Sequence, residues 1–365
     1  MIMTDRSSAG VVLVTGSSGF IGRAVVRRLA RSFLMVGFDR EGGNIHPPRE
    51  AECVCIDLTS DASVQAGLER VRYAYGDRIA CVVHLAAYYD FSGEPSPLYE
   101  EITVRGTGRL LRALQAFNVE QFIFSSTVLV HAPCEPGQRI NEDWPLDPKW
   151  DYPRSKVATE DLIRRERGDI RTVSLRIAGV YDDDCHSIPL ANQIQRIFER
   201  TLTSKVFPSN ISHGQSFVHL DDAIEAVART VEARAQLAQD ETLLIGEPDT
   251  MSYDDLQRAF GRLIHGEEWE TQSIPKAVAK AGAWLEDHVP GEEPFIKPWM
   301  IDLADDHYVL DIGRARTTLG WEPKRSLRET LPRMVSALKA DPLRFYTMNK
   351  LEAPSWLQHS VTPER

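Results

Sequence analysis

The stretch from Val11 to Gly22 constrains the fold of this chain more than any other. Aliphatic and β-branched residues run into a glycine-rich turn, and an amphipathic segment follows from Arg23 to Arg31. This order predicts a buried strand, a tight turn and the start of a helix. Gly16 would allow the turn, Gly19 would let backbone N–H groups approach a pyrophosphate, and Gly22 would let the helix pack on the strand. The ligand contacts predicted from this dinucleotide-binding turn are Gly16, Ser18, Gly19, Phe20, Ile21 and Gly22.

An acidic residue ends the next predicted strand, residues 34–38. Asp39 follows the glycines by about 20 residues, the distance at which a carboxylate accepts hydrogen bonds from an adenosine ribose. A carboxylate at this position repels a 2′-phosphate, so NAD is the expected cofactor. Arg40 could pair with that phosphate, which keeps NADP open.

The composition excludes several classes of function. A chain of 365 residues can bury a sizeable core, and its net charge of −11 argues against nucleic acid and anionic membranes as partners. No apolar run reaches the length of a membrane span, and the first ten residues are polar, so we expect a cytoplasmic protein. The five cysteines form no Cys-x-x-Cys pair and no metal-binding spacing, so we expect reduced thiols and no metal.

Strand and helix patterns alternate along the first half of the chain. Predicted strands at 53–56, 79–85 and 121–127 are separated by predicted helices at 62–74 and 98–117. This alternation predicts a Rossmann-type doubly wound α/β fold, a parallel sheet with helices on both faces. In such sheets the ligand lies at the carboxyl ends of the strands. The residues expected to converge on that crevice are Gly16, Asp39, Asp57, Ala86 and Thr127.

A hydroxyl, a phenol and an ammonium form the predicted catalytic group. Tyr152 and Lys156 are four residues apart, on one face of a predicted helix. A phenol is a poor base at neutral pH unless a nearby cation stabilises the phenolate, and Lys156 could supply that cation. Tyr152 would then exchange a proton with an alcohol or a carbonyl while Thr127 holds the substrate oxygen.

From about Val11 to Leu338 the chain resembles the extended short-chain dehydrogenases/reductases of the NAD-dependent epimerase/dehydratase family. The matching segments are Thr15–Gly22, Asp39, Asp57–Leu58, His84–Ala87, Ser125–Thr127, Tyr152 with Lys156, Leu175–Tyr181, Phe217–Asp222 and Leu319–Pro323. The resemblance implies that Asp57 and Leu58 flank the adenine, that Ala86 and Ala87 lie along the cofactor, and that Lys156 bonds the nicotinamide ribose. It also implies cofactor contacts from Leu85, Ser125, Ile177 and Val180.

The resemblance also implies a domain organisation. Residues 1–180 with 215–245 would form the NAD-binding domain, 181–214 and 246–342 a smaller α/β substrate domain, and 343–365 a tail. A homodimer would form through residues 98–117 and 152–165. Residues 274–289 and 290–306 are expected to cover a pocket for a small-molecule substrate. Trp299, Met300 and Tyr308 are candidate lining residues, although aromatic residues of this kind more often belong to the core.

Departures from the family pattern bear on the substrate. Many sugar-nucleotide members carry Asn where Ala178 stands, so no side-chain donor for a diphosphate is present. Thr127 is followed by Val128 and Leu129, which argues against a 4,6-dehydratase. The acidic run 182–184 would repel a diphosphate if it faced the pocket; the other interpretation is an exposed loop.

Two histidines have competing interpretations. His186 resembles the proton donor of certain deoxysugar epimerase-reductases and has a suitable ordinary pKa, although an isolated histidine is more often structural. His219 is interpreted as structural, and Asp221 and Asp222 are expected to cap the helix that follows it.

Three functions follow from these patterns. The first is an epimerase-type NAD-dependent oxidoreductase acting on a sugar or sugar nucleotide with a retained cofactor. The second is a dehydrogenase or carbonyl reductase for a less polar, steroid-like alcohol or ketone. The third is a non-catalytic NAD-binding sensor, which the presence of both Tyr152 and Lys156 disfavours.

Overall fold

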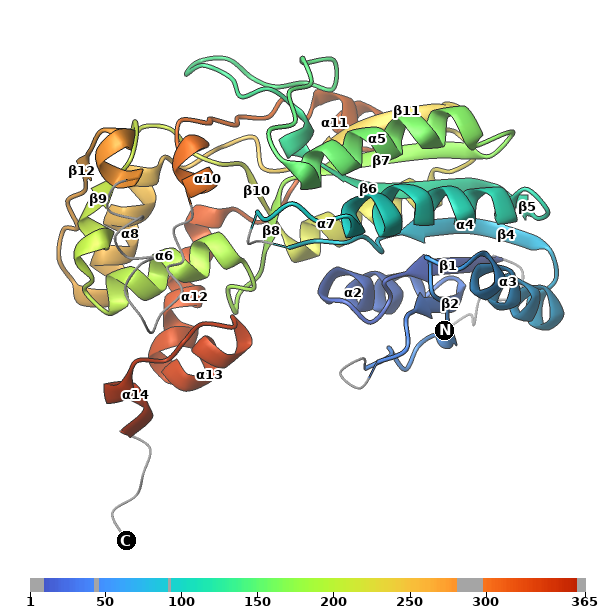
Figure 1. Ribbon diagram of the computed structural model, residues 1–365, viewed down its shortest axis with the longest axis horizontal. Helices are drawn as coiled ribbons and strands as arrows, with labels where there is room; N and C mark the ends of the chain where they lie inside the picture. Colours follow the sequence, from blue (N-terminus) through green and yellow to red (C-terminus); the bar gives the residue numbers. More distant parts are fainter. Residues whose placement is uncertain (1–9, 43–45, 91–92, 281–297, 360–365) are drawn as a thin grey trace, which may run out of the picture.

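The computed structural model describes residues 10–42, 46–90, 93–280 and 298–359. In this part of the chain, parallel strands form one eight-stranded sheet in the order β11-β7-β6-β4-β1-β2-β3, with β5 beside β4 (Figure 1). The strands are β1 (Val11–Thr15), β2 (Leu34–Asp39), β3 (Glu52–Cys55), β4 (Arg78–His84), β5 (Asn118–Val119), β6 (Gln121–Thr127), β7 (Arg171–Ile177) and β11 (Asp240–Ile245). The order reverses between β1 and β4, which is where doubly wound sheets open their ligand crevice. The predicted Rossmann-type fold is confirmed.

Helices cover both faces of the sheet because alternate strand residues point to opposite faces. Val12 and Val14 enter one hydrophobic cluster with side chains of α2 and α7. Val11 and Leu13 enter a second cluster with side chains of α3, α4 and α5. These helices are α2 (Phe20–Leu29), α7 (Leu220–Glu232), α3 (Asp61–Tyr75), α4 (Gly106–Leu114) and α5 (Asp151–Glu166).

The helix predicted over 98–117 has two parts. A π-helical segment, η1 (Tyr99–Arg105), leads directly into α4. The Thr103 hydroxyl in η1 accepts a hydrogen bond from the backbone N–H of Tyr88 at 3.0 Å. The backbone carbonyl of Thr103 accepts a hydrogen bond from the Thr107 hydroxyl at 2.5 Å. The Thr103 side chain therefore joins this helix to the segment after β4.

A third hydrophobic cluster lies beside the sheet, among helices drawn on the left of Figure 1. Its helices are α6 (Ile188–Phe198), α8 (Tyr253–His265), α12 (Leu327–Ala340), α13 (Pro342–Met348) and α14 (Ser355–His359). Short parallel pairs join β8 (Gly179–Tyr181) to β10 (Phe217–His219) and β9 (Val206–Phe207) to β12 (Gln272–Ser273). Phe345 and Leu357 of the expected tail pack in this third cluster. The proposed domain boundaries stay a prediction.

Residues 308–321 return to the sheet. This segment includes α11 (Gly313–Leu319), and its Leu310 and Trp321 are buried in the cluster that contains α2 and α7. Tyr308 belongs to the same cluster and is 2% exposed, with its hydroxyl donating to the carbonyl of His131 at 3.2 Å. Of the two interpretations of Tyr308, a pocket-lining residue or a core residue, the structure supports the core residue.

The expected cover of the pocket is described only in part. The helix predicted over 274–289 is helical at residues 276–280, whereas Trp284 and the rest lie outside the described residues. The same holds for residues 290–297 of the predicted lid, and α10 (Pro298–Asp302) follows them. Within the described ranges, no helix is long and apolar enough to cross a bilayer.

The cap of α7 differs from the expectation. The N-cap residue is His219, whose Nδ1 accepts a hydrogen bond from the backbone N–H of Asp221 at 3.1 Å. Asp221 and Asp222 instead occupy the first helical turn. There their negative charge still interacts favourably with the helix dipole. The prediction that these two residues cap the helix is wrong, while the structural role expected for His219 matches this geometry.

Candidate active site

The glycine turn after β1 is tightly built. Gly16 has a φ of +68°, and an added Cβ there would lie 3.1 Å from the backbone nitrogen of Ala86. A Cβ on Gly22 would overlap the carbonyl oxygen of Gly16. Both glycines are therefore required by the close approach of the turn to the end of β4 and to α2.

The turn fits the pyrophosphate of a dinucleotide. Gly19 is the N-cap of α2, no side chain caps this helix, and its first turn contains no acidic residue. Arg27 and Arg28 lie in its last turn. The hydroxyl oxygen of Ser18 is buried without a hydrogen-bond partner among the described residues. Free N–H groups, the positive helix end and an unused hydroxyl suit an anionic group.

Asp39 braces the same turn from the end of β2. Its Oδ2 accepts hydrogen bonds from the backbone N–H of Ser18 at 2.6 Å and from the Ser17 hydroxyl at 3.0 Å. No partner of Oδ1 is found in the described part of the chain. The carboxylate therefore holds the glycine turn with one oxygen while the other can accept from a ribose. Arg40 is exposed.

Thr15 connects the ends of β1 and β4. Its hydroxyl accepts hydrogen bonds from the backbone N–H groups of Leu85 and Ala86, each at 3.1 Å. It also lies 2.7 Å from Nδ1 of His84, whose Nε2 is 2.9 Å from the Thr107 hydroxyl. Burial lowers the pKa of His84 to about 3, so this imidazole is neutral.

The remaining predicted cofactor contacts lie at neighbouring strand ends. Asp57 accepts hydrogen bonds from the backbone and hydroxyl of Thr59, which lower the pKa of its carboxyl. Leu58 is buried against Gly106. Ala87 follows β4, Ile177 ends β7 and is 7% exposed, and Val180 lies in β8.

The structure brings Thr127, Tyr152 and Lys156 together at the end of β6. Burial raises the pKa of the Tyr152 phenol to about 12, and the nearby Thr127 side chain opposes this change. The ammonium of Lys156 donates to the carbonyl of Ser125 at 2.7 Å and lies 5.6 Å from the centre of the Tyr152 ring. Burial lowers the pKa of Lys156 to about 7. In this geometry the cation lies beside the phenol but hydrogen-bonds the backbone.

Aromatic rings surround the Tyr152 phenol. The ring of Tyr89 meets that of Tyr152 edge-on with centroids 4.8 Å apart, and the Trp150 ring lies 5.4 Å away. Trp299 of α10 packs on Trp150 with centroids 5.0 Å apart. We call Tyr89, Trp150, Tyr152 and Trp299 the aromatic wall. A side chain on Gly93, whose φ is +76°, would overlap the Trp299 indole. Trp299 can therefore occupy its place in the wall only if residue 93 has no side chain.

A buried ionic network lies below Lys156. Glu160, one turn after Lys156 on α5, is 1% exposed and forms a two-pronged ion pair with Arg176 of β7, at 2.7 and 3.1 Å. The Ser126 hydroxyl donates to Glu160 at 2.5 Å, and Arg176 reaches Nε2 of His131 at 3.0 Å. The sequence analysis missed Glu160, although its spacing from Tyr152 and Lys156 places all three on one helix face.

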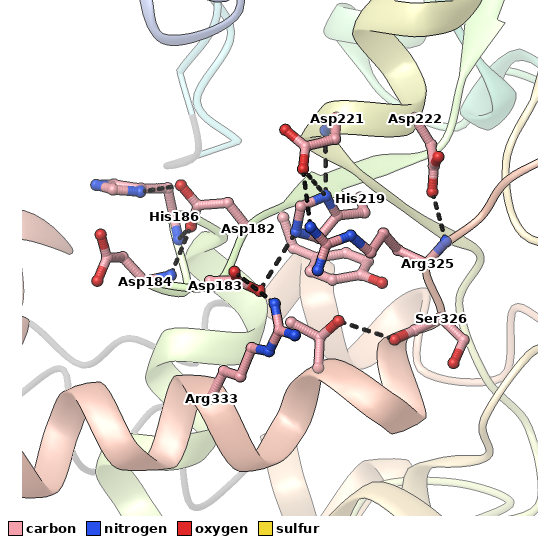
Figure 2. A network of polar contacts seen from close by, with 12 residues as sticks. Asp182, Asp183, Asp184, His186, His219, Asp221, Asp222, Arg325, Ser326 and Arg333 are labelled. Atoms are coloured by element: carbon pink, nitrogen blue, oxygen red, sulfur yellow. Dashed lines mark hydrogen bonds and ion pairs between the residues drawn. The ribbon is translucent and has the colours of Figure 1, made fainter.

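Each carboxylate of the acidic run 182–184 has a charged or polar partner, although the Asp183 and Asp184 side chains are 45% and 42% exposed. Asp182 Oδ2 lies 2.7 Å from Nδ1 of His186, and Asp183 lies 3.0 Å from Arg333 of α12 (Figure 2). Asp184 lies 3.8 Å from Arg344 of α13. His186 also contacts Phe20, with ring centroids 4.9 Å apart. The structure therefore places His186 beside the glycine turn.

Comparisons with known proteins identify the family. A profile of the NAD dependent epimerase/dehydratase family matches residues 12–246, more than half of the chain. The chain belongs to this family. Membership confirms the expected cofactor, NAD, and the prediction that the protein is an enzyme, an NAD-dependent oxidoreductase.

Relatives of this epimerase/dehydratase family member have two kinds of activity. The chain is 25% identical to a 3-beta-hydroxysteroid dehydrogenase of Mycolicibacterium neoaurum over 90% of this chain and 92% of the relative. It is 26% identical to a UDP-glucose 4-epimerase of Mycolicibacterium smegmatis over 88% of this chain and 96% of the relative. The Thermus thermophilus UDP-glucose 4-epimerase complex with NAD aligns with a TM-score of 0.66 and 23% identity, covering 90% of this chain and 99% of that one.

Proposed function

We propose that this family member is an NAD-dependent dehydrogenase that oxidises a secondary alcohol on a flat, apolar ring system, or reduces the corresponding ketone. The observation that carries this proposal is the aromatic wall, in which the rings of Tyr89 and Trp150 lie beside the phenol of Tyr152 and Trp299 extends the wall from Trp150. Aromatic faces bind flat apolar molecules through a large buried area. Ala178, with no side-chain donor, further disfavours a diphosphate. Relatives named as 3-beta-hydroxysteroid dehydrogenases support this substrate class.

Each catalytic side chain has a distinct role in this proposal. Bound NAD would supply the hydride acceptor or donor. The phenol oxygen of Tyr152 exchanges a proton with the substrate oxygen, and the Thr127 hydroxyl at the end of β6 holds the substrate oxygen in line. Lys156 provides a positive charge that favours the phenolate once the substrate displaces water. His186 is not assigned a proton-transfer role, because its ring contacts Phe20 instead of the aromatic wall.

Turnover assays with purified protein and NAD test the proposal directly. Flat hydroxysteroids and UDP-glucose are offered separately, and NADH absorbance is followed. NADH should form with a hydroxysteroid in the wild-type protein and in Tyr89→Phe, which removes a hydroxyl from the same wall. Tyr152→Phe should lower the rate by ~10²–10⁴-fold.

A sugar nucleotide is the second candidate substrate, favoured by the UDP-glucose 4-epimerase relative. This function predicts interconversion of UDP-glucose and UDP-galactose without net NADH, and near-stoichiometric NAD released on denaturation. That result would overturn the dehydrogenase proposal. A third result, tight NAD binding without turnover of either class, would favour the sensor. Arg40 is the residue that would pair with the 2′-phosphate of NADP, and parallel assays with both dinucleotides test whether the enzyme also accepts NADP.

We also propose that the enzyme acts in the cytoplasm as a homodimer, with no nucleic-acid or membrane partner. The net charge of −11 supports the absence of both partners. Helices α4 and α5 pack side by side, so a second copy could complete a four-helix bundle. Light scattering of the purified protein should give twice the mass of one chain, and a monomer mass would remove the dimer.

A further inference from the structure

The loop that carries His186 is folded around one carboxylate. Oδ1 of Asp182 accepts hydrogen bonds from the backbone N–H groups of Asp184 at 3.1 Å and His186 at 3.0 Å, while Oδ2 lies 2.7 Å from Nδ1 of the His186 ring. Between them, Cys185 is 0% exposed and has a φ of 63°, a conformation that is costly for a residue with a side chain. Such strain persists only where the surroundings determine the backbone.

Charged groups from other elements hold the loop in place. Asp183 pairs with Arg333 of α12 at 3.0 Å, and its second oxygen lies 3.5 Å from Nε2 of the buried His219. Asp184 lies 3.8 Å from Arg344 of α13. Figure 2 shows Asp183 of the loop pointing toward Arg333, whereas Asp184 points away from it. These contacts fix the backbone of the loop and therefore the position of His186.

The imidazole of His186 lies against the N-terminus of α2. Its ring centroid is 4.9 Å from that of Phe20, with the ring planes inclined at 43°. Phe20 is the first residue of α2 and directly follows Gly19, so it stands at the helix end that fits a pyrophosphate. Because Nδ1 hydrogen-bonds Asp182, the outer nitrogen Nε2 is left to meet a ligand (Figure 2).

We propose that His186 is a dinucleotide-binding residue that donates a hydrogen bond from Nε2 to the diphosphate of the cofactor bound at the start of α2. This role differs from substrate proton transfer and depends on NAD binding, not on the identity of the substrate. The donor must be the imidazolium, since Nδ1–H already points to Asp182 in the neutral alternative.

The charges around His186 favour this protonated form. The hydrogen bond that the imidazole donates to Asp182 raises the pKa of His186, burial opposes this increase, and the charges of Asp182 and Asp184 add to it. Arg344 on α13 acts in the opposite direction. Diphosphate affinity should therefore fall as the pH rises through the titration of His186.

Calorimetric titration of cofactor-free protein with adenosine, ADP and NAD tests this role without an activity assay. His186→Gln should weaken ADP and NAD by ~10-fold or more, the size expected for a charge-assisted hydrogen bond, and leave adenosine unchanged. The wild-type preference for low pH should disappear. His265→Gln, which removes an imidazole bonded to the Ile197 carbonyl on the far helices, should bind all three ligands normally.

A second variant keeps the loop while changing the charge. Asp182→Asn should retain the hydrogen-bonded turn and move the pH midpoint of ADP binding downward. Equal weakening of adenosine, unchanged ADP affinity, or weakening of NAD alone would each overturn the diphosphate contact. Failure of the dehydrogenase assay with this binding pattern intact would reject only the proposed substrate.

Discussion

Lys156 donates a hydrogen bond from its ammonium to the backbone carbonyl of Ser125, and the two atoms are 2.7 Å apart. The same nitrogen lies 4.8 Å from the centre of the Phe124 ring. Lys156 is 2% exposed, and burial lowers its pKa to about 7, with Glu160 opposing the change. The fold therefore holds the Lys156 ammonium next to the Tyr152 phenol, although burial of this charge costs desolvation free energy.

Replacing this cation should change both stability and rate. The unfolded chain keeps the Lys156 proton up to its ordinary pKa of 10.5, whereas the folded protein releases it near 7, so wild-type stability should rise with pH across that window. Lys156→Met should lack the rise and lose activity by ~10²-fold or more. Thermal unfolding of both proteins at pH values between about 7 and 10.5 measures this rise in stability. Lys339→Met, which removes an exposed ammonium bonded to the Leu263 carbonyl, is the control.

The ion pair below Lys156 should be sensitive to removal of one charge. Glu160→Gln leaves Arg176 buried, with side chain 5% exposed, and is expected to cost about 3–5 kcal/mol in the free energy of unfolding. Glu166→Gln on the same helix removes a partly exposed partner of Arg112 and should cost less than about 1 kcal/mol. Urea denaturation of both variants compares them. A similar loss of unfolding free energy in both variants would mean that the buried ion pair contributes no more to stability than the exposed one.

A buried carboxyl should make stability fall between weakly acidic and neutral pH. Burial raises the pKa of Glu247 from 4.5 to about 7, and its oxygens accept from the Tyr181 hydroxyl and the Leu327 N–H. The unfolded chain loses this proton first, so the folded state binds more protons in this window and loses stability as pH rises. Glu247→Gln should therefore gain up to about 3 kcal/mol relative to wild type over the window. Parallel stability curves for the two proteins would contradict this.

The glycine turn should tolerate no side chain at Gly22. In Gly22→Ala the new Cβ would overlap the Gly16 carbonyl, so the turn must open, and NAD affinity should fall by more than ~10-fold. Gly137→Ala is the control, because that glycine has a φ of +89° with open space around it. The control should cost only about 1 kcal/mol of backbone strain and bind NAD normally. Fluorescence titration with NAD separates the two cases.

The aromatic wall should govern substrate affinity more than chemistry. Trp299→Ala removes an indole from the wall and should raise KM for a flat hydroxysteroid by ~10–100-fold, with kcat changed little. Gly93→Ala should act in the same direction by displacing that indole. Trp356→Ala, which is 54% exposed on α14, should leave both constants unchanged. A fall in kcat at constant KM would argue that Trp299 supports the catalytic group instead.

Local patterns predicted much of this molecule. The glycine turn, Asp39 and the pair of Tyr152 and Lys156 are defined by short spacings within one or two elements, and in the structure the glycine turn and Asp39 follow or end neighbouring strands of one sheet. The histidine cap of α7 was missed because Asp is the commoner cap residue.

Contacts between distant segments could not be predicted in the same way. The pairing of Glu160 with Arg176 requires α5 to pack on β7, and the wall joins Tyr89, Trp150 and Trp299 from separate parts of the chain. The partners of the acidic run lie on α12 and α13, about 150 residues later, and no local spacing encodes them.

The Thr15 hydroxyl affects how the nucleotide binds at the ends of β1 and β4. The Thr15 hydroxyl accepts hydrogen bonds from Leu85 and Ala86. These bonds set the spacing between the ends of β1 and β4 before a nucleotide binds. The protein then has little backbone to order at the switch point on binding, so less conformational entropy is lost there. Differences in affinity among dinucleotides should consequently arise from direct contacts at this rigid seat, and association should be fast and free of a slow conformational phase.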